Sequence, residues 1–256
     1  CGRLKIPGLL LPVVCELFES TLRCEPALSN TLARTELVKL SPAAVKIVIQ
    51  KGAITEELLP GLEPIERPLQ DATIAQLQNL QRKSEQLNIT DDPVANYIEA
   101  SFSLAETRSI HGNAVQENRA AIYALGIVLG HRELGELILG RRFDDSMFEF
   151  VQQQNGKLTI RGRRDWTRHY FISAALAAHT SVTVSNAAGL FKEEYDAGGG
   201  SGFSFADLLA DRAGTRLAQE ATRNEASARK IQQRSSSTLT VDDFFPPAAD
   251  LPEGIY

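Results

Sequence analysis

The sequence has no excess of basic residues, and this absence excludes a class of function. It contains 27 Lys and Arg against 32 Asp and Glu, which gives a formal net charge of −5. This balance argues against a general nucleic-acid binder, because such proteins normally carry a basic surplus. The one local exception is a group of four arginines: Arg161, Arg163, Arg164 and Arg168. We favour the interpretation that they form the solvated basic start of a helix, and the alternative is a phosphate-binding patch.

Long hydrophobic runs are also missing. No apolar stretch reaches the roughly 18 residues that a membrane-spanning helix needs. The best candidate, Ala120 to Gly130, is short and is followed at once by His131, Arg132 and Glu133, so we predict a buried helix there. A hydrophobic fraction of 43% over 256 residues is nevertheless enough for one sizeable core or two modest ones.

Familiar catalytic motifs do not occur in the sequence. There is no nucleophile elbow, no HExxH pair and no CxxC motif. The glycine loop Gly198 to Gly202 lacks the lysine of a Walker motif. We therefore predict that Ser204, just after this loop, caps the next helix together with Asp207 rather than holding a phosphate.

The scarce cysteines give the first indication of a location. The sequence starts at Cys1, and its single Met is Met147. An N-terminal cysteine is what a bacterial lipoprotein retains once its signal is cleaved and the new terminus is acylated; the alternative is a boundary that falls on a cysteine by chance. On the first interpretation we expect lipidation of Cys1, anchoring to a membrane surface, and an outer-membrane lipoprotein on the periplasmic side of a bacterial membrane, with an envelope protein as partner.

The other two cysteines agree with this location. Cys15 and Cys24 are close enough in sequence to close a small loop, leaving Cys1 for the lipid. A disulfide closing about ten residues would contribute about 2–3 kcal/mol in the chain-entropy model and would persist only in an oxidising compartment. The alternative is a pair of buried free thiols in a cytosolic protein.

Helix signals dominate the remaining sequence. We predict a mainly α, bundle-like fold with at most a short β-hairpin near 148–161, where Asn155-Gly156 is either a hairpin turn or a helix C-cap. The glycines within 114–139 either allow close packing of one long helix or divide it into two. The predicted divisions are an anchor and linker segment (1–24), a helical N-terminal region (25–150), a C-terminal helical unit (151–234) and an extended tail (235–256).

Three predicted helices of the C-terminal unit, near 165–178, 182–196 and 203–232, each present a pair of polar side chains on one face. Asp165 lies four residues before His169 and is placed to orient the imidazole. The other pairs are three and four residues apart, so the candidate catalytic residues are Asp165, His169, Glu193, Asp196, Asp207 and Asp211. The candidate ligand-binding residues are Lys192 and Ser204, and the candidate metal ligands are His169, Glu193 and Asp196.

This polar cluster has three interpretations. In the first, it is an internal network in which Lys192 and Arg212 balance the acids. In the second, it is a site for a divalent metal or another ligand. In the third, it is the acid–base centre of a hydrolase that uses a metal or a carboxylate–His pair on an envelope substrate. We favour the first, which predicts a non-catalytic structural or interaction protein. The sequence identifies no cofactor beyond a divalent metal as one candidate.

The order of these motifs resembles the YfiM-type family of predicted bacterial lipoproteins. The resemblance rests on Asp165-Trp-Thr-Arg-His169-Tyr-Phe, Lys192-Glu193-Glu-Tyr-Asp196 and Gly202-Phe-Ser204-Phe-Ala-Asp207 with Asp211 and Gly214. It covers about residues 165–214, and Trp166 and Arg168 depart from the family pattern. It implies a Gram-negative envelope lipoprotein and supplies no activity.

The cysteine assignment leads to a first prediction. In protein isolated without reducing agent, Cys15 and Cys24 should resist alkylation and give one cross-linked peptide, because an oxidising compartment keeps the pair as a disulfide. Peptide mass spectrometry before and after reduction measures this directly. Two thiols that are alkylated without reduction would favour the cytosolic alternative.

Overall fold

The computed structural model describes residues 65–89, 92–154, 156–179, 204–235, 238–248 and 251–254. Within these ranges the chain is mainly helical and forms no strand, which confirms the predicted fold class. In chain order the elements are α4 (Arg67–Leu87), α5 (Pro93–Arg108), α6 (Ala114–Leu125), the π-helix η2 (Gly126–Gly130), α7 (Glu133–Leu139), the 3-10 helix η3 (Gly140–Arg142), α8 (Asp145–Gln154), α9 (Arg164–His179), α11 (Phe205–Thr222), α12 (Glu225–Ser235) and α13 (Val241–Phe244).

Several sequence predictions fall outside the described residues and stay predictions. These include the three cysteines and the helix predicted near 182–196, with its candidates Lys192, Glu193 and Asp196.

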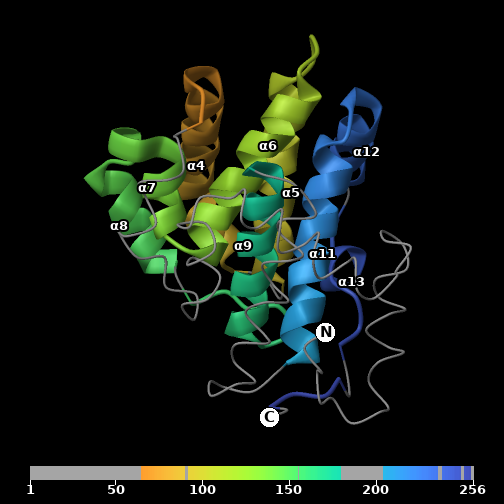
Figure 1. Cartoon of the computed structure of the whole chain (residues 1–256). Coiled ribbons are helices and arrows are strands. Elements are labelled where there is room, and N and C mark those ends of the chain that lie inside the picture. Colours follow the sequence, from red (N-terminus) through yellow and green to blue (C-terminus); the bar gives the residue numbers. More distant parts are fainter. Residues whose placement is uncertain are drawn as a thin grey trace, which may run out of the picture.

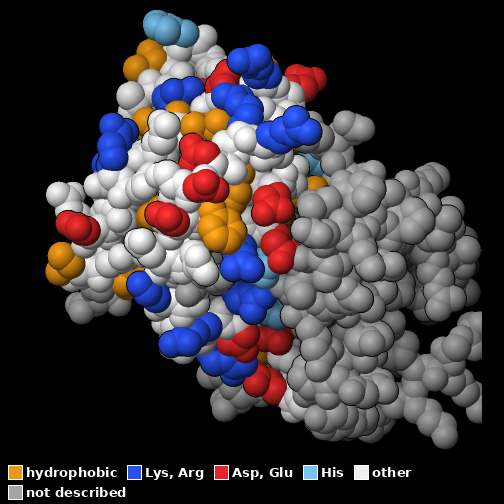
Figure 2. All heavy atoms as spheres, turned by 90° about the vertical axis from the view of Figure 1, so that its left-hand side faces the viewer, with side chains coloured by type: hydrophobic (Ala, Val, Ile, Leu, Met, Phe, Trp, Pro, Cys, Tyr) orange, Lys and Arg blue, Asp and Glu red, His pale blue; other side chains and the backbone are white. Residues whose placement is uncertain are grey.

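Among the helices that are described, none is both long and apolar enough to cross a bilayer. On the face shown in Figure 2, basic and acidic side chains are interspersed with exposed apolar ones, as on an ordinary solvated surface.

Local signals account for the ends of the helices. The Asp92 carboxylate accepts a hydrogen bond from the Ala95 N–H, and Pro93 begins α5. Helix α4 is fixed to α5 by buried amides, since Gln76 Nε2 donates to the Ser101 carbonyl and Asn79 Nδ2 to the Ala100 carbonyl.

The apolar stretch 114–139 is divided, and the division lies at its glycines. Helix α6 passes into η2, where the His131 N–H donates to the Gly126 carbonyl at 2.9 Å, and α7 follows after a short break. A Cβ at Gly126 would stand 2.7 Å from Ala175 Cβ, and one at Gly130 would stand 3.1 Å from Ile172 Cγ1. The glycines therefore let η2 lie directly against α9.

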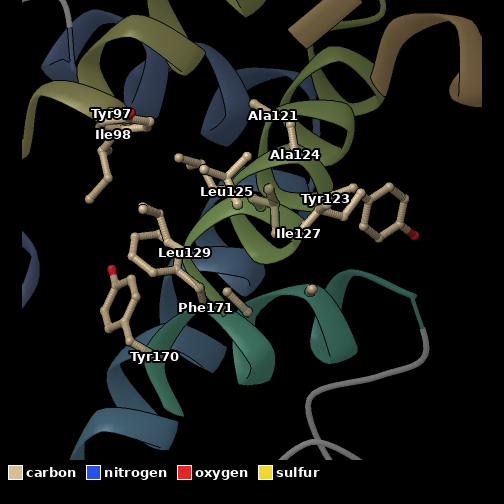
Figure 3. Packing of buried hydrophobic residues seen from close by; sticks show 14 of the residues in the cluster. Tyr97, Ile98, Ala121, Tyr123, Ala124, Leu125, Ile127, Leu129, Tyr170 and Phe171 are labelled. Carbon is tan, nitrogen blue, oxygen red and sulfur yellow. The ribbon is translucent and has the colours of Figure 1, made fainter. Parts of the chain in front are cut away.

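Helix α9 packs most extensively against α11 and also against η2 and α6. Figure 1 shows α9 beside α11, and Figure 3 shows its Tyr170 and Phe171 packed beneath Leu129 of η2. Both aromatic side chains are fully buried. On the α11 side the approach is closer still, because a Cβ at Gly214 would overlap the Tyr170 carbonyl oxygen. One helix thus receives glycine contacts on two sides.

One predicted helix is divided in the structure, and the choice left open within 148–161 is decided. The stretch predicted as one helix over 203–232 is two helices, α11 and α12, which meet at Arg223-Asn224. No hairpin occurs in the described part of 148–161: α8 continues to Gln154, Gly156 has a φ of 72°, and an isolated bridge joins Ile160 to Arg163. Of the two alternatives for this turn, the end of a helix is the correct one.

The close contact of α9 and α11 predicts an unusual effect of a glycine-to-alanine change. Gly214→Ala should lower the free energy of unfolding by about 2–4 kcal/mol, because the new methyl group meets backbone that cannot rotate away. In an open helix the same change would stabilise by about 1 kcal/mol. Chemical denaturation measures the difference, with Gln219→Ala on the exposed face of α11 as control. A Gly214→Ala variant as stable as the parent would contradict the packing.

Candidate functional site

His169 on α9 lies between two carboxylates of α11. Its Nδ1 atom is 3.1 Å from Asp211 Oδ1, and its Nε2 atom is 3.5 Å from Asp207 Oδ2. The same Asp211 oxygen accepts a hydrogen bond of 2.7 Å from Ser173 Oγ, one turn along α9 from His169. We call these four residues the His169 clasp. All four are largely or fully buried; the side chains of His169, Asp207 and Asp211 are 13%, 15% and 5% exposed.

The spacing of the two aspartates produces this arrangement. Asp207 and Asp211 are four residues apart on α11, so their side chains lie on one face, one turn from each other. Ser204 caps the first turn by accepting the Asp207 N–H at 3.1 Å, as predicted, and so fixes where α11 begins. The cap and the helical repeat together place both carboxylates against α9.

The geometry decides what the imidazole can do. The Nδ1 atom is at hydrogen-bond distance from Asp211, whereas the Nε2 atom lies 3.5 Å from Asp207, which is ion-pair range but longer than a usual N–H···O hydrogen bond. The carboxylates bind different edges of the ring and do not converge on one point. Accordingly, the described residues contain no group of three His, Cys, Asp or Glu side chains that could hold a metal ion.

The clasp also differs from a catalytic triad. In a triad the carboxylate orients the imidazole, and the imidazole accepts the proton of the nucleophilic hydroxyl. Here the Ser173 hydroxyl donates to Asp211 rather than to His169. The hydroxyl is therefore held by an acid that also binds the imidazole, which is the pattern of a structural network.

Asp165 does not take the role predicted for it. Its carboxylate pairs with Arg163, whose Nε donates at 2.9 Å, and the orientation of His169 falls to Asp211 instead. Burial acts to raise the pKa of Asp165, but the hydrogen bonds and charge of Arg163 outweigh it, so the pKa is lowered. The prediction failed because an arginine two residues away competes for the carboxylate. The structure brings together three predicted residues: His169, Asp207 and Asp211.

A second buried polar network was not found from the sequence. Gln232 of α12 donates from Nε2 to Asn118 Oδ1 at 2.9 Å and to Ser109 Oγ at 3.0 Å. Asn118 Nδ2 in turn donates to the carbonyls of Ala221 and Ala228. These residues fix α12 to α5 and α6. Isolated Asn and Gln give no sequence signal for partners this far along the chain.

His131 has a strongly lowered pKa. It follows η2, and its side chain is 13% exposed. Burial, together with the positive charges of Arg168 and Arg132, lowers the pKa of His131 to about 4. His131 therefore stays neutral in the folded protein at neutral pH.

Comparison with known proteins finds no relative for this chain. No protein-family model matches it, and neither a curated protein nor a solved structure shows significant similarity to it. The resemblance of residues 165–214 to the YfiM-type family accordingly stays a prediction.

The low pKa of His131 predicts a pH dependence of stability. In the unfolded chain His131 binds a proton below about pH 6.5, whereas in the folded protein it does so only near pH 4. The stability that neutral His131 contributes to the fold is therefore fully present above pH 6.5 and is lost as the pH falls. Between these pH values the loss should total about 2–4 kcal/mol. In denaturation curves, the stability difference between the parent and His131→Gln should shrink across this window. Parallel curves for the two proteins would contradict it.

Proposed function

We propose that this protein is a non-catalytic structural or interaction protein of the bacterial envelope, in which the His169 clasp holds two helices together. The observation that supports this most is that both imidazole nitrogens face carboxylates of α11: Nδ1 is hydrogen-bonded to Asp211, and Nε2 lies within ion-pair distance of Asp207. A general base needs one ring nitrogen directed at a substrate proton, and a metal ligand needs one directed at the ion. His169 has both directed at the neighbouring helix.

The connectivity of the clasp supports the same proposal. Asp211 Oδ1 receives both Ser173 and His169, so one carboxylate ties two successive turns of α9 to α11. A buried carboxylate is costly unless hydrogen bonds compensate it, and the two contacts compensate Oδ1, while the buried Oδ2 has no hydrogen-bond partner among the described residues. The cluster then serves the assembly of the bundle, and function falls to the surface that the bundle presents.

The envelope location is proposed on sequence grounds. It is supported by the order of polar motifs shared with the YfiM-type lipoproteins and by the spacing of Cys15 and Cys24, which suits a disulfide. We further propose a lipid anchor on Cys1 and an envelope protein as partner. The hydrolase alternative would need one ring nitrogen of His169 to leave its carboxylate.

Matched aspartate-to-asparagine changes test the role of the clasp. Asp211→Asn should lower the free energy of unfolding by about 2–3 kcal/mol, because a buried charge-assisted network loses its acceptor charge. Asp165→Asn should cost less than about 1 kcal/mol, since Asp165 is 42% exposed and its pair with Arg163 is screened by solvent. Both are measured by chemical denaturation at neutral pH.

A control on the metal separates structure from chemistry. Elemental analysis of the purified full chain should find no stoichiometric metal that His169→Ala removes, while that variant melts at a lower temperature than the parent. A metal present in the parent and lost with His169 would contradict the proposal. So would a variant of unchanged stability that loses a hydrolytic activity of the parent.

A further inference from the structure

The C-terminal residues 238–248 and 251–254, which we call the strap, pack on α9 beside the clasp. They include α13, and Figure 1 shows the strap continuing from there as the dark blue end of the chain. Phe245 stacks on Trp166 with ring centroids 5.4 Å apart and an interplanar angle of 20°. Phe244 meets Tyr170 edge to face at 5.8 Å. Phe245 is 1% exposed, so this aromatic contact is the centre of the strap's attachment.

Ion pairs at the periphery hold the strap in register. Arg161 pairs with Asp242, and Arg163 Nη1 donates to Glu253 Oε1 at 3.0 Å. The Arg163 guanidinium also lies over the Trp166 ring, 4.8 Å from its centroid. These pairs are exposed, because the Asp242 and Glu253 side chains are 76% and 37% accessible. Each therefore stabilises the docked strap only weakly, and the aromatic residues supply most of the attachment.

The strap covers α9 without satisfying all of its polar atoms. Trp166 Nε1 and the Tyr170 hydroxyl are buried and have no hydrogen-bond partner within the part of the chain that the structure describes. An unsatisfied buried donor carries a free-energy cost, so a segment that offered an acceptor here would fit better than the strap does. The surface itself combines Trp, Tyr and Arg, the residue types that dominate the energetics of protein interfaces.

We propose that the face of α9 formed by Trp166 and Tyr170, flanked by Arg161 and Arg163, is a docking face for an acidic polypeptide segment with adjacent aromatic residues. The strap covers this face as an intramolecular competitor. The strap shows the required chemistry, since Asp242-Asp243 precede Phe244-Phe245. Asp242 and Glu253 meet the flanking arginines, Asp243 caps α13 through Thr240 and pairs with Arg234, and the two rings pack on Trp166 and Tyr170. The proposal rests on the interaction function above and names the class of partner.

Trp166 is the single tryptophan of the chain, so its fluorescence reports directly whether this face of α9 is covered. In the full chain carrying Phe244→Ala and Phe245→Ala, acrylamide should quench Trp166 at least twofold more strongly than in the parent. A synthetic peptide of residues 238–254, which contains no tryptophan, should restore the protection when added in excess. The same peptide with both phenylalanines replaced by alanine is the matched control and should have no effect.

A milder variant keeps the test decisive if the double variant does not fold, which circular dichroism and thermal melting will reveal. Glu253→Gln removes an exposed ion pair of the strap and should increase the apparent affinity of the full chain for the peptide by roughly two- to fivefold over the parent. Trp166 that is protected equally in all variants, or peptide that protects it in none, overturns the proposal. Such a failure leaves the His169 result untouched, and a metal at His169 would overturn the proposed function without changing the peptide result.

Discussion

Helices α9 and α11 cross so closely that the Gly214 position has no space for a side-chain carbon beside the Tyr170 carbonyl. Every other feature of the C-terminal part depends on this contact. It brings Asp207 and Asp211 within reach of His169, and α9 in turn contacts the glycines of η2 on another side. A small displacement of α11 would separate the carboxylates from the imidazole and open the core around Phe171.

The close contact needs a second interaction to fix its register. Many of the buried apolar residues of α9 and α11 are alanines, whose small side chains alone fix a helix register weakly. The His169 clasp fixes it more firmly, because Asp211 must reach both Ser173 and the imidazole at the same time. Packing brings the helices together, and the polar residues set their alignment. The Asn118–Gln232 network does the same for α12.

Sequence reasoning succeeded where the determining interaction is local. The cap at Ser204 and the mainly helical fold both follow from residues within a few positions of one another. The grouping of His169 with Asp207 and Asp211 was also predicted, because helical spacing places both aspartates on one face. The partner of Asp165 was not, since the choice between His169 and Arg163 depends on side-chain geometry that spacing does not encode.

Interactions between distant segments were the least predictable. The tail from residue 235 gives an extended sequence signal, yet its described residues include α13 and place Phe245 against Trp166. Nothing near either residue in sequence indicates the other. The same holds for η2, whose π turn follows from glycines that meet a helix more than 30 residues later. The predicted contributions of Lys192, Glu193 and Asp196 fall outside the described residues and stay predictions.

The central claim is that His169 and Asp211 stabilise the fold as a coupled pair, and a double-mutant cycle tests it most directly. The free energies of unfolding of His169→Ala, Asp211→Ala and the double variant are compared with that of the parent. If the pair joins α9 to α11, the double variant should lose less than the sum of the single losses, with a coupling energy of about 1–3 kcal/mol. Strictly additive losses, or single variants as stable as the parent, would contradict the account.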